Sequence, residues 1–152
     1  VVKWAVLETM TEGETSPLIG EFLQLHLVFN PGAAFSLLSN TTWVFAIISS
    51  AVVVVIVVFA RRIRSAAWAT VFGLILGGAA GNLYDRLFRE PGFGVGHVVD
   101  YVQLWMFPAI FNIADVAICS AAGLFILLTL RGVGLDGTRA ATEKPAAESD
   151  AS

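Results

Sequence analysis

Three long apolar segments dominate the pattern of hydrophobic and polar positions along the chain. They lie at about residues 43–60, 66–83 and 111–130. At about 1.5 Å rise per residue, helices of these lengths approach the thickness of a hydrocarbon core of about 30 Å. The Val-rich run at 52–58 is too long and uninterrupted for a buried strand. We therefore predict three membrane-spanning helices.

The rest of the pattern predicts smaller elements. Residues 1–10 resemble the end of a further span, which makes a four-helix bundle whose first helix is mostly missing from this sequence. The stretch 22–29 partly alternates and runs into Asn30-Pro31-Gly32, which is typical of a strand followed by a turn in a small external β-sheet. Residues 132–152 lack periodicity and predict a disordered cytoplasmic tail after a membrane domain at 1–131. The expected fold is an all-α polytopic membrane protein with this sheet and an external loop.

Composition supports this membrane assignment. The chain is 57% hydrophobic and only 14% charged, with a mean hydropathy of +0.78, which excludes an ordinary soluble domain. The net charge of −3 offers no basic surface for nucleic acid. The single cysteine, Cys119, lies in an apolar run and is interpreted as a small buried hydrophobic residue.

The charged residues indicate the orientation in the membrane. Arg61, Arg62 and Arg64 fix the loop between the first two long helices as cytoplasmic, because short loops rich in Lys and Arg stay on that side. The C-terminus is then cytoplasmic as well. The other six charges of residues 22–130 all map to the opposite face: Asp85, Arg86, Arg89, Glu90, Asp100 and Asp115. An ionisable group at a membrane edge is a functional candidate by default.

Asp100 and Asp115 form the first candidate site. Each has a structural alternative: Asp115 can lie in the first turn of a helix capped by Asn112, and Asp100 can accept hydrogen bonds from loop amides. Two carboxylates that share one proton supply a general acid and a general base together. Because a helix N-terminus favours the anion of Asp115, we expect Asp100 to hold the proton more often.

Polar residues at the outer end of the third segment form the second part of the candidate site. Asn82, Asp85 and Arg86 are three or four residues apart and share one helix face. A local ion pair between Asp85 and Arg86 is the structural alternative. The repeat Gly73, Gly77 and Gly81 predicts close helix packing rather than chemistry.

The sequence does not predict a metal site or a serine nucleophile. His26 and His97 lack partners at metal-ligand spacing, and no Gly-x-Ser-x-Gly motif is present. The turn at Asn30-Pro31-Gly32 contains small residues that would let a peptide or lipid approach the backbone, although the same residues fit a simple turn.

Four sequence blocks taken together resemble those of bacterial lipoprotein signal peptidase, also called signal peptidase II. The blocks are Asn30-Pro31-Gly32-Ala33-Ala34-Phe35, Gly81-Asn82-Leu83-Tyr84-Asp85-Arg86, His97-Val98-Val99-Asp100-Tyr101 and Phe111-Asn112-Ile113-Ala114-Asp115. The resemblance covers roughly residues 1–131. It implies a four-helix aspartic endopeptidase of the bacterial inner membrane that cuts prolipoproteins N-terminal to a diacylglyceryl-modified Cys.

The same resemblance implies roles for individual residues. Asp100 and Asp115 would be the catalytic pair, and Asp85 would orient Arg86. The residues that would line the site and position the substrate are Asn30, Gly32, Asn82, Arg86 and Asn112. The resemblance further implies an external active site, no metal or organic cofactor, contact with membrane lipid, a monomer, and inhibition by globomycin.

Two features depart from the family pattern. Val1-Val2-Lys3 resembles the residues just after an Asp-Gln pair in the family's first helix. The Gly-rich stretch 87–96 is longer than usual, and it fits either a mobile flap over the cleft or an inert insertion.

Two non-enzymatic functions compete with proteolysis. A small transporter or channel subunit could use Asp100 and Asp115 as an ion or proton site, but that function favours charges deep within the spans. A catalytically silent relative that binds lipoproteins is the third possibility, and the presence of both Asp residues argues against it.

Overall fold

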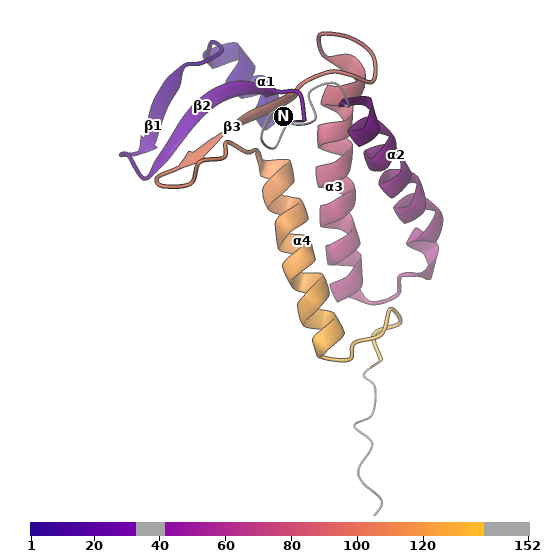
Figure 1. The fold of residues 1–152 in the computed structure, drawn as a ribbon. Helices are drawn as coiled ribbons and strands as arrows, with labels where there is room; N and C mark the ends of the chain where they lie inside the picture. Colours follow the sequence, from indigo (N-terminus) through magenta and orange to yellow (C-terminus); the bar gives the residue numbers. More distant parts are fainter. Residues whose placement is uncertain (33–41, 139–152) are drawn as a thin grey trace, which may run out of the picture.

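Three long helices and a small sheet make up the computed structural model, which describes residues 1–32 and 42–138 (Figure 1). The helices are α2 at Thr42–Phe59, followed by a 3₁₀ turn at Ala60–Arg62, α3 at Ala66–Phe88 and α4 at Ile113–Leu130. All three are long and apolar enough to cross a membrane. The three predicted spans are therefore confirmed as helices, and the fold is mostly helical.

The helix α3 lies between α2 and α4 (Figure 1). Its closest approach to α4 is at Gly78, where an added Cβ would lie 2.6 Å from the carbonyl oxygen of Ala114. Most of the glycine repeat at 73, 77 and 81 does not contact another helix among the described residues. A Cβ added at Gly73 or Gly77 would meet nothing within 4 Å. Only Gly81 of that repeat faces α4, at ordinary contact distance. The prediction of close helix packing at small residues is therefore correct. The glycine in closest contact is Gly78, one residue after the predicted Gly77.

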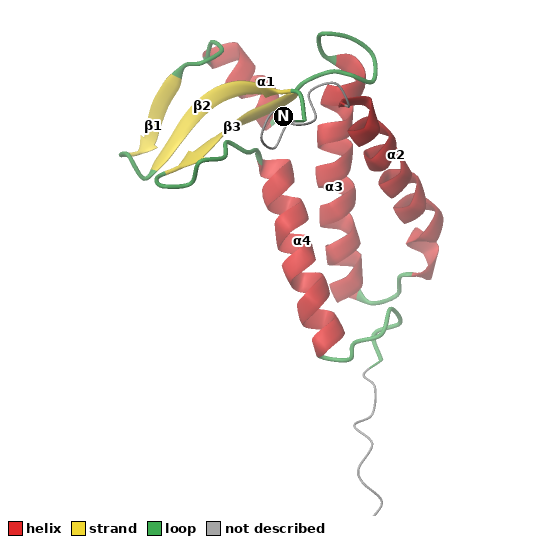
Figure 2. Cartoon of the chain, viewed as in Figure 1, coloured by secondary structure: helices red, strands yellow, loops and turns green. Residues whose placement is uncertain are grey.

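A three-stranded antiparallel sheet sits at one end of the helices (Figure 2). Its strands, in spatial order, are β1 at Thr15–Ile19, β2 at Leu23–Asn30 and β3 at Val98–Leu104. The short helix α1 at Val2–Thr9 packs on this sheet, where Val6, Leu27, Val99 and Tyr101 form a buried cluster. The predicted strand and turn at 22–32 correspond to β2, while β1 and β3 were not predicted.

The helix α3 continues five residues past its predicted end, to Phe88. Asp85 and Arg86 are therefore helical residues. The following Gly-rich stretch packs against this helix end, because an added Cβ at Gly96 would lie only 2.3 Å from the carbonyl oxygen of Asp85. The backbone N–H of Gly96 also donates to the carbonyl oxygen of Arg86, at 3.0 Å.

The segment after α4 packs against the opposite end of the bundle. The indole N–H of Trp68 donates to the carbonyl oxygen of Val133 at 2.9 Å, and the carbonyl of Leu135 accepts from the backbone N–H groups of Arg64 and Ser65. The segment predicted as a tail therefore begins with ordered residues at 132–138. Its remainder, 139–152, lies outside the described residues.

Candidate active site

Asp100 is held inside the sheet rather than in a loop. It lies in β3 opposite Val28 of β2, and it is only 2% exposed. Both of its oxygens accept hydrogen bonds from side-chain amides: Oδ1 from Nδ2 of Asn112 at 2.6 Å, and Oδ2 from Nδ2 of Asn30 at 2.8 Å. A buried carboxyl group with two directed donors has a fixed orientation.

Asp115 lies in the first turn of α4, as the capping alternative predicted. Asn112 is the N-cap, and its side-chain oxygen accepts from the backbone N–H of Ala114 at 2.7 Å. In return, Oδ2 of Asp115 accepts from the backbone N–H of Asn112 at 3.0 Å, which completes a capping box. The predicted cap is confirmed, and it leaves Oδ1 of Asp115 for other contacts.

Asn112 connects the two carboxyl groups. Its side chain donates to Asp100 while its backbone N–H donates to Asp115. Asn82 of α3 adds a second link, because its Nδ2 donates to Oδ1 of Asp115 at 2.8 Å and its Oδ1 accepts from Nδ2 of Asn112 at 3.2 Å. The structure thus brings the two predicted carboxylates into one hydrogen-bonded network formed by β3, α3 and α4.

A turn and an arginine border this network. The side-chain oxygen of Asn30 accepts from the backbone N–H of Gly32 at 2.8 Å. An added Cβ at Gly32 would lie 2.8 Å from the ring of Phe45 and 3.3 Å from Nη1 of Arg86, and its φ of +102° also requires glycine. The residues of the same block at 33–35 lie outside the described residues.

The guanidinium of Arg86 lies over the ring of Phe45, 5.1 Å from its centroid. Its Nη1 is buried and has no hydrogen-bond partner in the described part of the chain. A buried N–H without an acceptor is costly, and such a group is commonly satisfied by a ligand. Among residues 1–32 and 42–138, Arg86 therefore offers an unused donor beside Gly32.

Asp85 has different partners from those expected. Its carboxylate pairs with Nζ of Lys3 at 2.6 Å and with Nε of Arg89 at 2.5 Å, and it accepts from the backbone N–H of Val99 at 3.1 Å. Both oxygens of Asp85 are therefore engaged by groups other than Arg86, and the role of Asp85 in orienting Arg86 stays a prediction.

Lys3 is a site residue that the sequence analysis did not assign. Besides Asp85, its Nζ donates to Oδ1 of Asn82 at 2.8 Å. The available signal was a lysine within the otherwise apolar stretch at 1–7. Its partners could not be predicted, because Asn82 and Asp85 lie about eighty residues away in sequence.

Burial raises the pKa of the Asp100 carboxyl above its ordinary value, since the charged form is poorly solvated inside the sheet. Hydrogen bonds from Asn112 and Asn30 oppose this rise, and the negative charge of Asp115 adds to it. The direction agrees with the expectation that Asp100 holds the shared proton.

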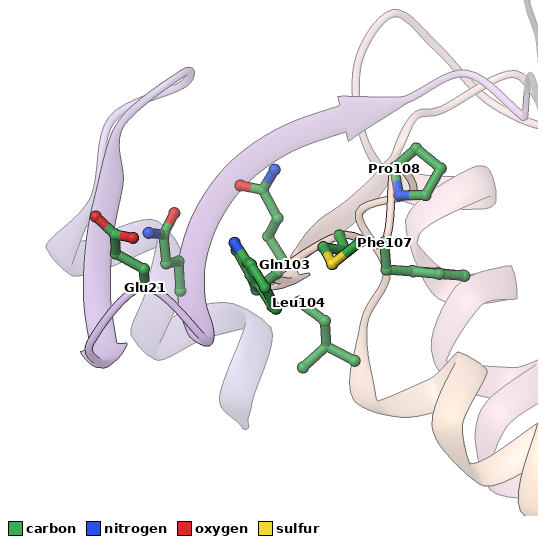
Figure 3. A pocket seen from close by; sticks show the side chains of 8 residues that line it. Glu21, Gln103, Leu104, Phe107 and Pro108 are labelled. Carbon is green, nitrogen blue, oxygen red and sulfur yellow. The ribbon is translucent and has the colours of Figure 1, made fainter.

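Two of the hollows among the described residues border the C-terminal part of β3. One, of about 420 Å³, lies beside the end of β3 at Leu104 (Figure 3). Its lining residues include Glu21, Gln103, Leu104, Phe107 and Pro108. The other, of about 480 Å³, adjoins Asp115 and is bounded almost wholly by apolar atoms, including those of Phe111, Val116 and Cys119. The second hollow connects one carboxylate to an apolar surface of α4.

Metal ligands do not gather at this site. Among residues 1–32 and 42–138, no group of three or more His, Cys, Asp or Glu side chains could hold a metal ion. The polar groups of the site include the carboxyl groups of Asp100 and Asp115, the side-chain amides of Asn30, Asn82 and Asn112, and the cations Lys3 and Arg86.

The fold and site define a helical membrane protein with paired, hydrogen-bonded carboxyl groups where a small sheet meets two spans. A family model described as signal peptidase (SPase) II matches residues 1–131. The chain therefore belongs to the signal peptidase II family, and it is a multi-pass bacterial membrane protein.

Individual relatives agree with this assignment. A lipoprotein signal peptidase of Leifsonia xyli subsp. xyli is 56% identical over 139 residues, which cover 91% of this chain and 64% of the relative. One from Rhodococcus jostii is 49% identical over 127 residues, covering 84% of this chain and 64% of the relative. The chain thus spans a little under two thirds of the length of both relatives.

A solved structure described as a bacterial membrane enzyme has the same fold. It aligns with a TM-score of 0.73 and 29% identity, covering 85% of this chain and 78% of the solved one.

Proposed function

We propose that this protein is an aspartic endopeptidase of the bacterial cytoplasmic membrane. It removes the signal peptide from diacylglyceryl-modified prolipoproteins by cutting N-terminal to the lipidated Cys. The observation that carries the proposal is the linkage of Asp100 and Asp115 through Asn112, in a chain of the signal peptidase II family.

The two carboxyl groups would divide the acid and base work. Asp115, at a helix N-terminus, acts as the anionic base that takes a proton from water, and the water oxygen bonds to the scissile carbonyl carbon. Asp100 donates its proton to the carbonyl oxygen. In the breakdown step the C–N bond breaks, the amine nitrogen takes the proton from Asp115, and a hydroxyl of the intermediate returns a proton to Asp100, which restores the pair. Asn112 and Asn82 hold both carboxyl groups in position throughout.

Arg86 and Gly32 would position the peptide. Nη1 of Arg86 has no hydrogen-bond partner within the described ranges 1–32 and 42–138, and it donates to a substrate carbonyl oxygen. Gly32 leaves room for the substrate backbone beside it. Asn30 holds this turn while it donates to Asp100. The hollow beside Asp115 is too apolar to satisfy the hydrogen bonds of a peptide backbone, and it fits an acyl chain of the substrate instead.

The membrane arrangement belongs to the same proposal. The active site faces the extracytoplasmic side, and the Arg61–Arg64 loop and the C-terminus face the cytoplasm. Trp105, Met106 and Phe107 are exposed next to the sheet and would rest against membrane lipid. The protein acts as a monomer, and globomycin would occupy the cleft in competition with substrate.

Lipid dependence of cleavage tests the proposal. The protein, expressed from its complete reading frame, is expected to shorten a diacylglyceryl-modified prolipoprotein in a gel-shift assay. The same precursor without lipid should stay uncut, because it has no acyl chain to fill the hollow beside Asp115. Mass spectrometry of the product should find the lipidated Cys at the new N-terminus. Failure to cut the lipidated precursor would reject the peptidase function, and equal cutting of both precursors would reject the lipid requirement.

The pH dependence gives a further prediction. If Asp100 must supply a proton, kcat/KM should fall as the pH rises through the pKa of its folded carboxyl. Since burial raises that pKa, the fall should lie above the ordinary value of about 3.9 for aspartate. Initial rates across the pH range, measured on protein whose fold is verified at each pH, provide the test. A profile without this descending limb would count against the shared proton.

The transporter or channel alternative is not favoured, because the chain belongs to a peptidase family. In addition, Asp100 lies in β3 and Asp115 in the first turn of α4, so neither carboxyl group is in the middle of a span.

A further inference from the structure

Lys3 makes two contacts from the short helix α1. Its Nζ lies 2.6 Å from Oδ2 of Asp85 and 2.8 Å from Oδ1 of Asn82, and its side chain is 15% exposed. The first contact is an ion pair with a fully buried carboxylate. The second reaches the residue that donates to Asp115. Lys3 thus links a structural ion pair to the candidate catalytic group.

The contact from Lys3 acts together with the bond from Nδ2 of Asn112 to set which end of the Asn82 amide faces Asp115. An ammonium group only donates, so the atom of Asn82 that faces Lys3 must be the oxygen. The NH₂ group is then directed at Oδ1 of Asp115. In the reverse orientation, the NH₂ group would oppose the ammonium and the oxygen would oppose a carboxylate. Both contacts would then be repulsive.

Asp85 holds Lys3 in the required place. Arg89 occupies its Oδ1, while Lys3 and the backbone N–H of Val99 share its Oδ2. Arg89 is therefore a natural comparison for Lys3, since it pairs with the same carboxylate. Unlike Lys3, it makes no hydrogen bond to Asn82 in the described part of the chain.

We propose that Lys3 is a positioning residue for peptide cleavage: it orients the amide of Asn82 so that Asn82 donates to Asp115. The inference rests on the proposed peptidase function. It assigns Lys3 no contact with the substrate, and it predicts that the effect of Lys3 on catalysis is transmitted through Asn82.

A double-mutant cycle tests this transmission. Lys3→Met should lower kcat about 10-fold with little change in KM, because the lost donor supports a group that acts in the reaction. In an Asn82→Ala background the same substitution should change kcat less than about 2-fold. Lys3→Arg should recover much of the activity, since a guanidinium can also donate to both acceptors. An equal effect of Lys3→Met in both backgrounds would overturn the inference.

Arg89→Met is the matched control for the ion pair. It removes one partner of Asp85, so its thermal midpoint should fall like that of Lys3→Met, while kcat should stay within about 3-fold of the parent. A loss of kcat equal to that of Lys3→Met would make Lys3 a purely structural residue.

The pH profile adds a readout that a structural role would not change. The charged groups around the site are Lys3 on α1, Asp85, Arg86 and Arg89 on α3, Asp100 on β3 and Asp115 on α4. The positive charge of Lys3 opposes the rise in the pKa of Asp100. Lys3→Met should therefore move the high-pH limb of kcat/KM to higher pH, whereas Arg89→Met should leave it in place. An unshifted limb in Lys3→Met would contradict an electrostatic link to the carboxyl pair.

The activity of the unmodified protein shows whether only the role of Lys3 is wrong or the peptidase function as well. If it cuts the lipidated precursor but the cycle shows no coupling, only the role of Lys3 is wrong. If it does not cut, the peptidase function falls, and the role of Lys3 falls with it.

Discussion

Asp100→Asn and Asp115→Asn are each expected to lower kcat by about 10³-fold or more, because each removes one half of the acid and base pair. At either position the amide also places an NH₂ group against a donor. Both oxygens of Asp100 accept from asparagine amides, and both oxygens of Asp115 accept from N–H groups. Cleavage of the lipidated precursor, followed by gel shift over long incubations, measures the residual rate.

Asp136→Asn is the control for this pair. It makes the same chemical change in the turn after α4, where Oδ1 of Asp136 accepts only from Thr138 among the described residues. It should retain full activity. Membrane insertion and thermal stability of all three variants must match the parent within about 1 kcal/mol for the comparison to hold. If either catalytic-pair variant cut at the parental rate, the carboxyl pair could not be the acid and base.

The helices were predictable because their signal is local. A run of about eighteen apolar residues has few alternatives to a spanning helix, and the boundaries of α2 and α4 agree with the predicted ones to within two residues. The end of α3 was misjudged, because the prediction stopped where charged residues begin. A helix can leave the hydrocarbon and continue in the interface, where Asp85 finds Lys3 and Arg89 as partners.

The sheet was only partly predictable. The strand β2 has an alternating pattern and a turn after it, whereas β3 is buried on both faces at residues 98–101 and therefore lacks alternation. The strand β1 contains Pro17, which weakened its strand pattern and fits an edge position. Asp100 consequently looked like a loop residue, although a strand holds it.

The residues of the site could be predicted from the sequence, but the hydrogen bonds between distant ones could not. The three-residue spacing of Asn112 and Asp115 is local and predicted the cap, which the structure confirms. The bond from Asn82 to Asp115 joins different helices and depends on how α3 packs against α4. The same limit applies to Lys3, whose partners are set by the docking of α1.

Gly78→Ala is expected to lower kcat about 100-fold and to destabilise the fold by about 1–3 kcal/mol. The added Cβ would lie 2.6 Å from the carbonyl oxygen of Ala114 and 2.7 Å from the side chain of Ile118. Backbone cannot move aside as a side chain can, so α4 must shift away from α3. Because Asp115 follows Ala114 directly, that shift stretches the bond between Asn82 and Asp115. Cleavage rates and thermal melts in detergent measure the two effects.

Gly77→Ala isolates the effect of this contact. It adds the same methyl group one residue away, where nothing described lies within 4 Å, and Ala is favoured over Gly in a helix interior by about 1 kcal/mol. We expect activity near the parental value and equal or higher stability. If Gly78→Ala also kept full activity, the separation of α3 and α4 could not control the carboxyl geometry. If both variants lost activity alike, the loss would follow from replacing a glycine of α3 at either position. Close packing at Gly78 would then not explain it.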